Sequence, residues 1–249
     1  LEDVVKLDPY NISLLSNVVV HQGKEIIECQ LRVDGINANI KLGDYDNIVQ
    51  DSNRQEKIDA TIIFWELANL IDGLHYKIDL LSEVEVDELE QRVESEIEFA
   101  LKNLKNSPLV IINQFTSLFF SSSNIRNNKL EDLAQKLNFY LTSFLQPNLQ
   151  LINIDKVISS VNIGESFDQR YYYSSKAPYS VSFFRAYAEF IKPIFMSING
   201  KAKKALIFDC DNTLWKGILG EDGINNIDMS GKTKDGAIFQ EIQSIALSL

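Results

Sequence analysis

The sequence predicts an α/β fold in which a doubly wound parallel sheet is covered by helices on both faces. Short apolar runs of strand length alternate with longer segments whose apolar residues recur at helical spacing. This alternation is typical of a parallel sheet, because parallel neighbours need a crossover connection. The length of 249 residues allows two domains, which we place at residues 1–199 and 200–249.

The strand-length runs come in a regular order along the first domain. They are Ile12–Leu15, Ala38–Leu42, Thr61–Trp65, Leu109–Ile112 and Leu149–Ile154. The first run stops at Ser16-Asn17, a pair of residue types that cap helices, and we expect these two residues to begin a helix that reaches to about Val33.

Three further helices follow from apolar spacing. One apolar stripe runs from Val86 to Leu104 and another from Leu130 to Phe144, both at helical spacing. A segment rich in Phe and Tyr, Ser180–Ser197, predicts the helix that closes the first domain. The polar triplet Asn199-Gly200-Lys201 is then the expected hinge into the second domain.

Composition excludes several classes of protein. The chain has 35 acidic and 24 basic residues, a net charge of −11, so it lacks the basic surface of a general nucleic-acid binder or anionic-membrane binder. Eight of the acids lie between Glu83 and Glu98, where we expect a solvated helix face. No apolar run reaches the roughly 20 residues of a membrane span. Two cysteines and no leader-like start indicate a cytoplasmic protein, and the missing initiator Met indicates a trimmed start.

One segment of the second domain contains candidate catalytic residues. The apolar run Ala205–Phe208 is a predicted strand, and it delivers Asp209 and Asp211 at its carboxyl end, where ligands bind in open α/β sheets. Asp209 can attack phosphorus as a nucleophile, and Asp211 can act as the general acid and base. Charge repulsion on the order of 4 kcal/mol per charge pair at 4 Å would oppose this attack, so a Mg²⁺ ion is expected beside the two acids. Asn212 and Thr213 would hold the turn and bind the phosphate.

The same segment resembles a known family. D-C-D-N-T-L at residues 209–214 is similar to motif I of the haloacid dehalogenase (HAD) superfamily, and W-K-G-I-L-G-E-D-G-I from Trp215 to Ile224 resembles its FkbH-like branch, subfamily IIIC. Lys216 stands where many relatives carry Gly. The resemblance implies a Rossmann-like domain and a Mg²⁺-dependent phosphatase or phosphotransferase that forms an aspartyl-phosphate on a phosphorylated metabolite. It also implies that the main-chain carbonyl of Asp211 ligates the metal together with Asp209.

Three further motifs of that superfamily are expected after Leu249: a Thr or Ser, a Lys, and an acidic metal ligand. We therefore expect this chain to hold only the first part of the phosphatase domain and to be inactive alone. Between Leu214 and the helix beginning near Ala237 there is room for no more than a flap.

Residues 10–200 resemble the SGNH hydrolase-like region that precedes the phosphatase domain in FkbH-like proteins. Ser16-Asn17 matches the first sequence block of that region, Gln50-Asp51-Ser52 the second, and Asn113 falls where the third block lies. The resemblance implies a flavodoxin-like sheet. For Ser16-Asn17 itself, a helix N-cap remains the preferred interpretation.

The last block of that region should hold the His that activates a serine, and here Tyr171 occupies its place. The chain has two histidines, His21 on a predicted helix and His75 in a predicted loop, and we interpret both as ordinary surface or capping residues. Because a serine without a base loses most of its reactivity, the first domain is predicted to be non-hydrolytic.

Two other functions remain open. FkbH-like proteins are linked to glyceryl or acyl transfer onto a carrier protein, in which Cys210 could carry the acyl group, although its alternate position predicts a buried core thiol. The first domain could also be a non-catalytic recognition module. We expect its loop with Arg170 and Lys176 to form one wall of the substrate entrance, because both side chains suit an anionic substrate.

Overall fold

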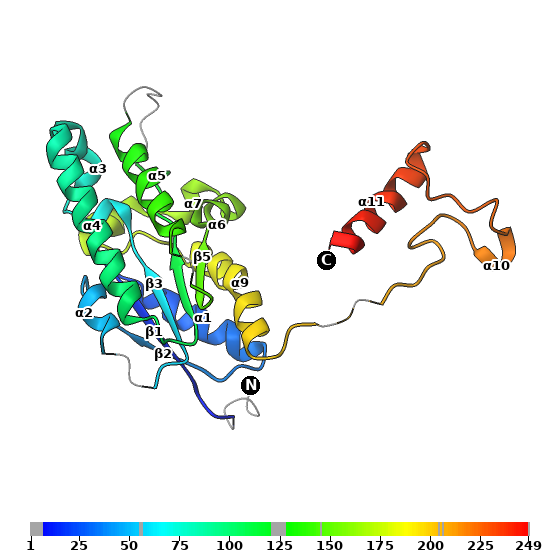
Figure 1. The fold of residues 1–249 in the computed structure, drawn as a ribbon, viewed down its shortest axis with the longest axis horizontal. Helices are drawn as coiled ribbons and strands as arrows, with labels where there is room; N and C mark the ends of the chain where they lie inside the picture. Colours follow the sequence, from blue (N-terminus) through cyan, green and yellow to red (C-terminus); the bar gives the residue numbers. More distant parts are fainter. Residues whose placement is uncertain are drawn as a thin grey trace. The chain divides into compact units, whose positions relative to one another are not determined.

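The computed structural model describes residues 7–54, 57–120, 128–144, 146–203, 205 and 207–248. The chain divides into two compact units, Leu1–Lys201 and Ala202–Leu249, which are described separately below (Figure 1). Among the described residues no helix is long and apolar enough to cross a membrane.

The first unit is built on a five-stranded parallel sheet with the strand order β2-β1-β3-β4-β5. The strands are β1 (Tyr10–Ser16), β2 (Ala38–Leu42), β3 (Ala60–Phe64), β4 (Val110–Asn113) and β5 (Leu149–Ile152). Each corresponds to one of the predicted apolar runs, and the predicted α/β fold is confirmed. The chain leaves β1 towards β2 on one side and returns to β3 on the other, so the carboxyl ends of β1 and β3 flank the topological switch point, where doubly wound sheets bind ligands.

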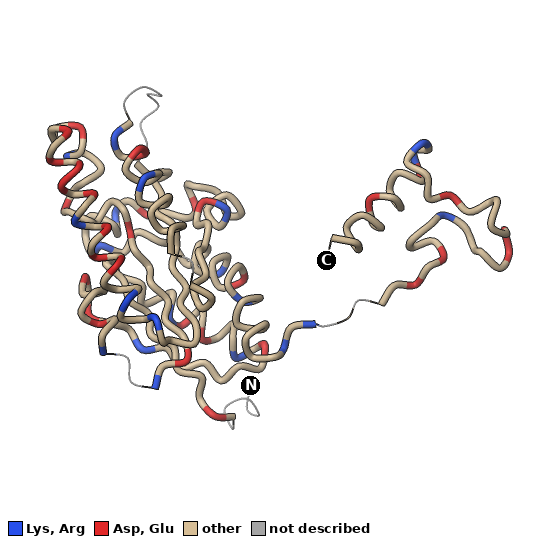
Figure 2. Tube along the Cα trace, viewed as in Figure 1, with Lys and Arg blue, Asp and Glu red and all other residues tan. Residues whose placement is uncertain are grey.

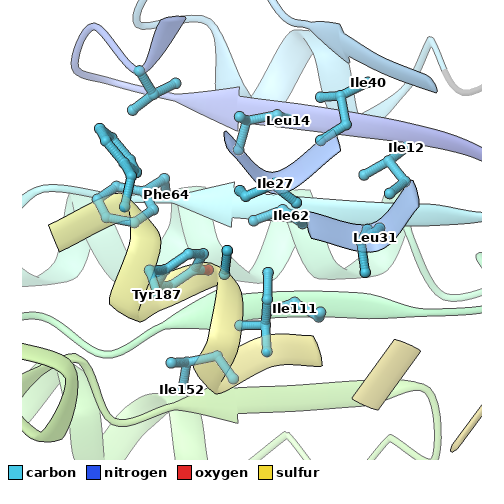
Figure 3. Packing of buried hydrophobic residues seen from close by; sticks show 14 of the residues in the cluster. Ile12, Leu14, Ile27, Leu31, Ile40, Ile62, Phe64, Ile111, Ile152 and Tyr187 are labelled. Carbon is cyan, nitrogen blue, oxygen red and sulfur yellow. The ribbon is translucent and has the colours of Figure 1, made fainter. Parts of the chain in front are cut away.

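One face of the sheet is covered by helices α1 (His21–Val33), α6 (Ile154–Val161) and α9 (Val181–Ile198) (Figure 1). Alternate residues of the strands point into this layer, for example Ile12 and Leu14 of β1, and Ile27 of α1 packs over them (Figure 3). Tyr187 of α9 is fully buried in the same cluster. The period of two along the strands and the apolar stripes of the helices together exclude water from this layer.

The opposite face is covered by α2 (Ile48–Ser52), α4 (Glu83–Asn103) and α5 (Lys129–Thr142). Helix α4 begins with a capping box, in which the Ser82 hydroxyl accepts from the Glu85 backbone N–H and the Glu85 carboxylate accepts from that of Ser82. Its outer side carries the acidic residues that the sequence places between Glu83 and Glu98, visible as a red stripe along the helix (Figure 2).

Several short elements lie between the predicted ones. They are α3 (Leu74–Lys77), α7 (Ile163–Ser166), α8 (Gln169–Ser175) and two single 3₁₀ turns, Leu67–Asn69 and Ile78–Leu80. His75 is therefore part of α3, and the expectation that it lies in a loop is wrong. Four residues of helix are too few for a periodic apolar pattern, which explains why the sequence did not show α3.

The second unit contains α10 (Leu219–Asp222), α11 (Lys234–Ser248) and two isolated bridges, Asp211 with Trp215 and Lys216 with Asp228. The strand predicted at Ala205–Phe208 is not formed among the described residues of that run, and the Ile207 side chain is 92% exposed. A strand pairs its N–H and C=O groups with a neighbour, and the described part of this unit holds no other strand to supply them.

Candidate functional site

Ser16 and Asn17 join the ends of β1 and β3. The Ser16 hydroxyl donates to the Phe64 carbonyl at 2.9 Å and accepts from the Val18 N–H at 3.1 Å. The Asn17 amide nitrogen donates to the Glu66 carbonyl at 2.9 Å, and its oxygen accepts from the Glu66 N–H at 2.7 Å. Both side chains thus satisfy backbone groups where two neighbouring strands end.

The predicted helix cap at Ser16-Asn17 is wrong. Helix α1 begins at His21, and its N-cap is Val20, which makes no side-chain capping bond. The predicted end of this helix at Val33 is correct. The polar pair is used instead by the neighbouring strand, a contact between residues almost fifty positions apart that a local capping rule does not consider.

A carboxylic acid is buried beside this pair. Glu66 follows β3 and is only 2% exposed; its carboxyl group accepts from the Ala68 N–H at 3.1 Å and from the Tyr179 hydroxyl. Burial raises the pKa of Glu66 to about 7, against the smaller opposing effects of the Tyr179 hydrogen bond and of backbone N–H groups. The carboxyl end of β3 therefore holds a group that changes its charge near neutral pH.

Two asparagines extend this buried set. Asn113, at the end of β4, donates to the Trp65 carbonyl and accepts from the Trp65 N–H, both at 3.2 Å. Asn69 donates to the main-chain carbonyl of Asn17 and to the Tyr45 hydroxyl, the latter at 3.1 Å. Asn113 was among the predicted block residues, whereas Glu66 and Asn69 were not predicted. For Glu66 the available signal was an acidic residue two positions after a buried strand; Asn69 lies in the turn Leu67–Asn69 and had no such signal.

No base is hydrogen-bonded to Ser16 in the part of the chain that the structure describes. Tyr171, at the position expected for His, lies in α8 and is 60% exposed. His75 stacks on Phe120 and is hydrogen-bonded to the Tyr173 hydroxyl at 3.0 Å; burial and the nearby Lys176 lower its pKa. The Ser16 hydroxyl donates its hydrogen bond to a backbone carbonyl, whereas the hydroxyl of an activated serine donates to a general base.

His21 lies near residues of both the first and the last predicted SGNH sequence block, although it is far from the last block in the sequence. It lines a hollow of about 90 Å³ together with Ser16 and Gly43. It also lines a cavity of about 410 Å³ that is bordered by Asp168 and Tyr171. This cavity lies at the starts of α1 and α9 and along α8, and the buried residues Tyr179 and Phe184 also line it.

Arg170 does not contribute to the lining of that cavity. Its guanidinium pairs with the Asp168 carboxylate at 3.3 Å, an ion pair that lowers the pKa of Asp168, and the Arg170 side chain is 90% exposed. Lys176 pairs with Asp72 at 2.6 Å and lies over the Tyr172 ring, with its ammonium 5.0 Å from the ring centroid. Both predicted substrate-binding cations therefore have acidic partners within the first unit.

In the second unit, Asp211 lies in a tight loop. One of its carboxylate oxygens, Oδ1, accepts from the Trp215 indole Nε1 at 3.0 Å and from the Leu219 backbone N–H at 3.1 Å. Asn212 has a φ angle of +52°, in the left-handed region, which Asn tolerates better than most residues. Its side-chain oxygen accepts from the Gly217 N–H at 2.9 Å, so the Asn212 side chain closes the loop; its predicted role in phosphate binding stays a prediction.

Backbone N–H groups of this loop are directed to its own carbonyls. Those of Thr213 and Leu214 donate to the Cys210 carbonyl at 3.2 and 2.8 Å, and that of Asn212 donates to the Gly217 carbonyl at 3.3 Å. A phosphate that used these N–H groups would have to replace the internal hydrogen bonds. Thr213 is half-buried, and its predicted role in phosphate binding stays a prediction.

Asp209 differs from Asp211 in having no partner among the residues that the structure describes. It is exposed, and its carboxylate makes no hydrogen bond or ion pair with any described residue. Cys210 between them is also exposed, so the expected buried thiol is wrong. Within the described residues no group of three or more His, Cys, Asp or Glu could hold a metal ion. Mg²⁺ requires fewer, because it is held by one or two carboxylates with waters and phosphate oxygens, and Asp209 and Asp211 fit that donor set.

Comparison with solved structures places the fold. The N-terminal part of the protein BF1531 from Bacteroides fragilis, described as containing a phosphatase domain complexed with Mg, is 22% identical, with a TM-score of 0.75, and the match covers 99% of this chain and 67% of that one. The lipase Lip_vut3 from a goat rumen metagenome is 12% identical, with a TM-score of 0.50 over 73% of this chain and 95% of that one. No protein-family model and no curated protein matches the sequence. The predicted SGNH-like, flavodoxin-like sheet is thereby confirmed as a fold.

Proposed function

We propose that this chain belongs to a Mg²⁺-dependent phosphatase or phosphotransferase that acts on a small phosphorylated metabolite through an aspartyl-phosphate. The observation that carries the proposal is the contrast between two neighbouring acids. Asp211 is held by two N–H donors, whereas the exposed carboxylate of Asp209 has no partner among the described residues. A nucleophile has to be free to reach phosphorus, and a general acid has to be oriented.

The chemistry assigns one step to each acid. A carboxylate oxygen of Asp209 forms a bond to phosphorus while the bond from phosphorus to the leaving oxygen breaks, and Asp211 gives its proton to that oxygen. In the second step water attacks phosphorus and gives a proton to Asp211. The bond between phosphorus and Asp209 then breaks, which releases phosphate and restores both acids. In a phosphotransferase an acceptor hydroxyl would replace the water.

Asp209 and the main-chain carbonyl of Asp211 would hold the metal ion. Bound Mg²⁺ would supply charge neutralisation between the Asp209 carboxylate and the phosphate dianion. The Mg-complexed neighbour BF1531 supports this assignment, since its phosphatase-containing N-terminal part matches this chain over nearly its whole length.

Phosphate release tests the proposal. The complete protein, including any residues that follow Leu249, is incubated with Mg²⁺ and a panel of phosphorylated metabolites, and free phosphate is measured. We expect Mg²⁺-dependent release that Asp209→Asn abolishes while the circular dichroism spectrum stays unchanged. Exposed Glu241→Gln, in α11 of the same unit, is the matched control and should keep activity. Full activity of Asp209→Asn would contradict the nucleophile assignment.

The exposure of Cys210 supports a second candidate function. A transferase that loads an acyl or glyceryl unit onto a carrier protein needs an accessible thiol, and this thiol is accessible between the two acids. Mass spectrometry of the protein after incubation with an acyl donor would show an adduct on Cys210 in this case. A Cys210→Ala variant with unchanged phosphate release and no adduct in the wild type would exclude the transferase.

A further inference from the structure

The carboxylate of Asp211 is held from one side only. Its Oδ1 accepts both N–H donors, the indole of Trp215 at 3.0 Å and the backbone amide of Leu219 at 3.1 Å. Its other oxygen, Oδ2, has no hydrogen bond to any residue that the structure describes. The two oxygens of one carboxylate therefore have different surroundings.

Both donors are also held by contacts that do not involve the Asp211 carboxylate. The residue after the indole, Lys216, exchanges two backbone hydrogen bonds with Asp228, at 2.8 and 2.9 Å. The residue before the amide, Ile218, donates its N–H to the Asp222 carboxylate at 2.7 Å. Gly217 between them has a φ angle of +108°, and a Cβ atom there would meet the Asp222 carboxylate at 3.1 Å. The loop thus sets where the two donors lie, and the carboxylate adapts to them.

We infer that Trp215 is a positioning residue that acts through Asp211, by turning its carboxylate so that Oδ2 exchanges the proton with substrate and water. This inference rests on the proposed function. N–H groups donate and cannot accept, so a proton on Oδ1 would face two donor hydrogens, and the carboxylic acid carries it on Oδ2 instead. The proton passes from Oδ2 to the leaving oxygen as its bond to phosphorus breaks, and Oδ2 takes one back from the attacking water.

A role in proton delivery has a signature that a structural role lacks. Nitrophenolate leaves phosphorus without needing a proton, whereas phenolate is a poorer leaving group and depends on the general acid. Trp215→Phe keeps an aromatic ring but removes the N–H donor. In the first turnover, we expect this variant to release phenol from phenyl phosphate about tenfold or more slowly. Release of nitrophenol from p-nitrophenyl phosphate should fall by less than about threefold, with KM unchanged for both.

Three further measurements link the effect to Asp211. In an Asp211→Asn background, Trp215→Phe should slow phenol release no further, because the group that Trp215 positions is already disabled. Replacement of Trp215 by benzothienylalanine, which has sulfur in place of the indole N–H, should reproduce the Trp215→Phe result. By NMR, the indole proton of Trp215 should exchange with solvent more slowly in the wild-type chain than in Asp211→Ala.

The possible failures can be told apart. An active wild type in which Trp215→Phe slows both substrates equally would overturn the positioning role and leave the proposed function intact. An indole proton that exchanges equally fast in wild type and Asp211→Ala would also overturn it, by showing that the hydrogen bond does not form. A complete protein that releases phosphate from neither substrate nor from any metabolite of the panel would refute the proposed function, and the inference with it.

Discussion

The polar groups at the carboxyl ends of β1 and β3 and those of the loop 209–217 differ in how completely they are used. At the strand ends, Ser16, Asn17 and Glu66 are buried. The side chains of Ser16 and Asn17 are hydrogen-bonded to backbone groups at and just after the end of β3, and that of Glu66 to the Ala68 N–H and the Tyr179 hydroxyl. In the loop, Asp209 is exposed without a partner among the described residues, and Asp211 uses one oxygen only. A polar cluster at the expected ligand site of a sheet can therefore be structural, whereas the carboxylates of an exposed loop can stay without hydrogen-bond partners.

The largest expected effect belongs to the loop. Asp211→Asn should lower turnover of the complete protein by about 10²- to 10⁴-fold, because the amide cannot supply or accept the proton. Stopped-flow measurement with p-nitrophenyl phosphate should still show a first burst of nitrophenol, since that leaving group needs no acid. A variant with wild-type steady-state turnover would assign the proton to another residue and remove the contrast between the two regions.

The buried acid at the strand ends predicts a pH dependence of stability. Folded Glu66 keeps its proton up to a pH of about 7, whereas in the unfolded chain it loses the proton near its ordinary pKa of 4.5. As the pH rises from about 4.5 to about 7, ionisation favours the unfolded state, so the free energy of unfolding falls, by an amount on the order of 3 kcal/mol at most. Above about pH 7 the decline ends.

Urea denaturation between pH 4.5 and 8, compared with Glu66→Gln, measures this effect. The amide cannot ionise, so the difference between wild type and variant should change across the window in the direction just given. Exposed Glu88→Gln is the control and should leave the wild-type pH profile unchanged. A constant difference between wild type and Glu66→Gln would show that Glu66 does not titrate in this range.

A pair of asparagines sharpens the comparison of stability. Asn17→Ala leaves the buried N–H of Glu66 without its partner and removes one of the two hydrogen bonds to the Glu66 carbonyl, and it should cost about 2–4 kcal/mol of the free energy of unfolding. Asn226→Ala removes an exposed hydrogen bond to the Asp222 carbonyl, at 2.8 Å, and should cost less than about 0.5 kcal/mol. Equal costs in chemical denaturation would mean that burial is not what separates the two regions.

A smaller effect than that of Asn17→Ala is expected at Ser16. Ser16→Ala removes the hydrogen bond to the Phe64 carbonyl and should cost about 1 kcal/mol of stability. Hydrolysis of a short-chain p-nitrophenyl ester should stay at the background rate in both wild type and variant, since no base is bonded to this hydroxyl in the described structure. An ester burst that disappears in Ser16→Ala would show instead that the first unit is a working hydrolase.

The sequence by itself determined the sheet and its main helices. The runs around Ile62 and Ile111 are continuously apolar because both faces of the sheet are buried at these central strands. The run Ala38–Leu42 alternates apolar and polar residues, as expected of the edge strand β2. Both patterns are local to each strand. The stripes from Val86 and from Leu130 likewise predicted α4 and α5. Asp209 and Asp211 were also predicted as site residues, because the motif that identifies them consists of residues adjacent in the chain.

Only the tertiary structure decided how the polar residues are used. Ser16 and Asn17 satisfy a helix-cap rule in sequence, but β3 lies beside them and its backbone groups take their side chains. Glu66 becomes a buried acid only because Tyr179, over a hundred residues later, closes over it. The physical reason is the distance along the chain between the groups that interact. Apolar periodicity reports the burial of each segment by itself, whereas a hydrogen bond requires a partner at a particular distance, and its position is set only when the chain has folded.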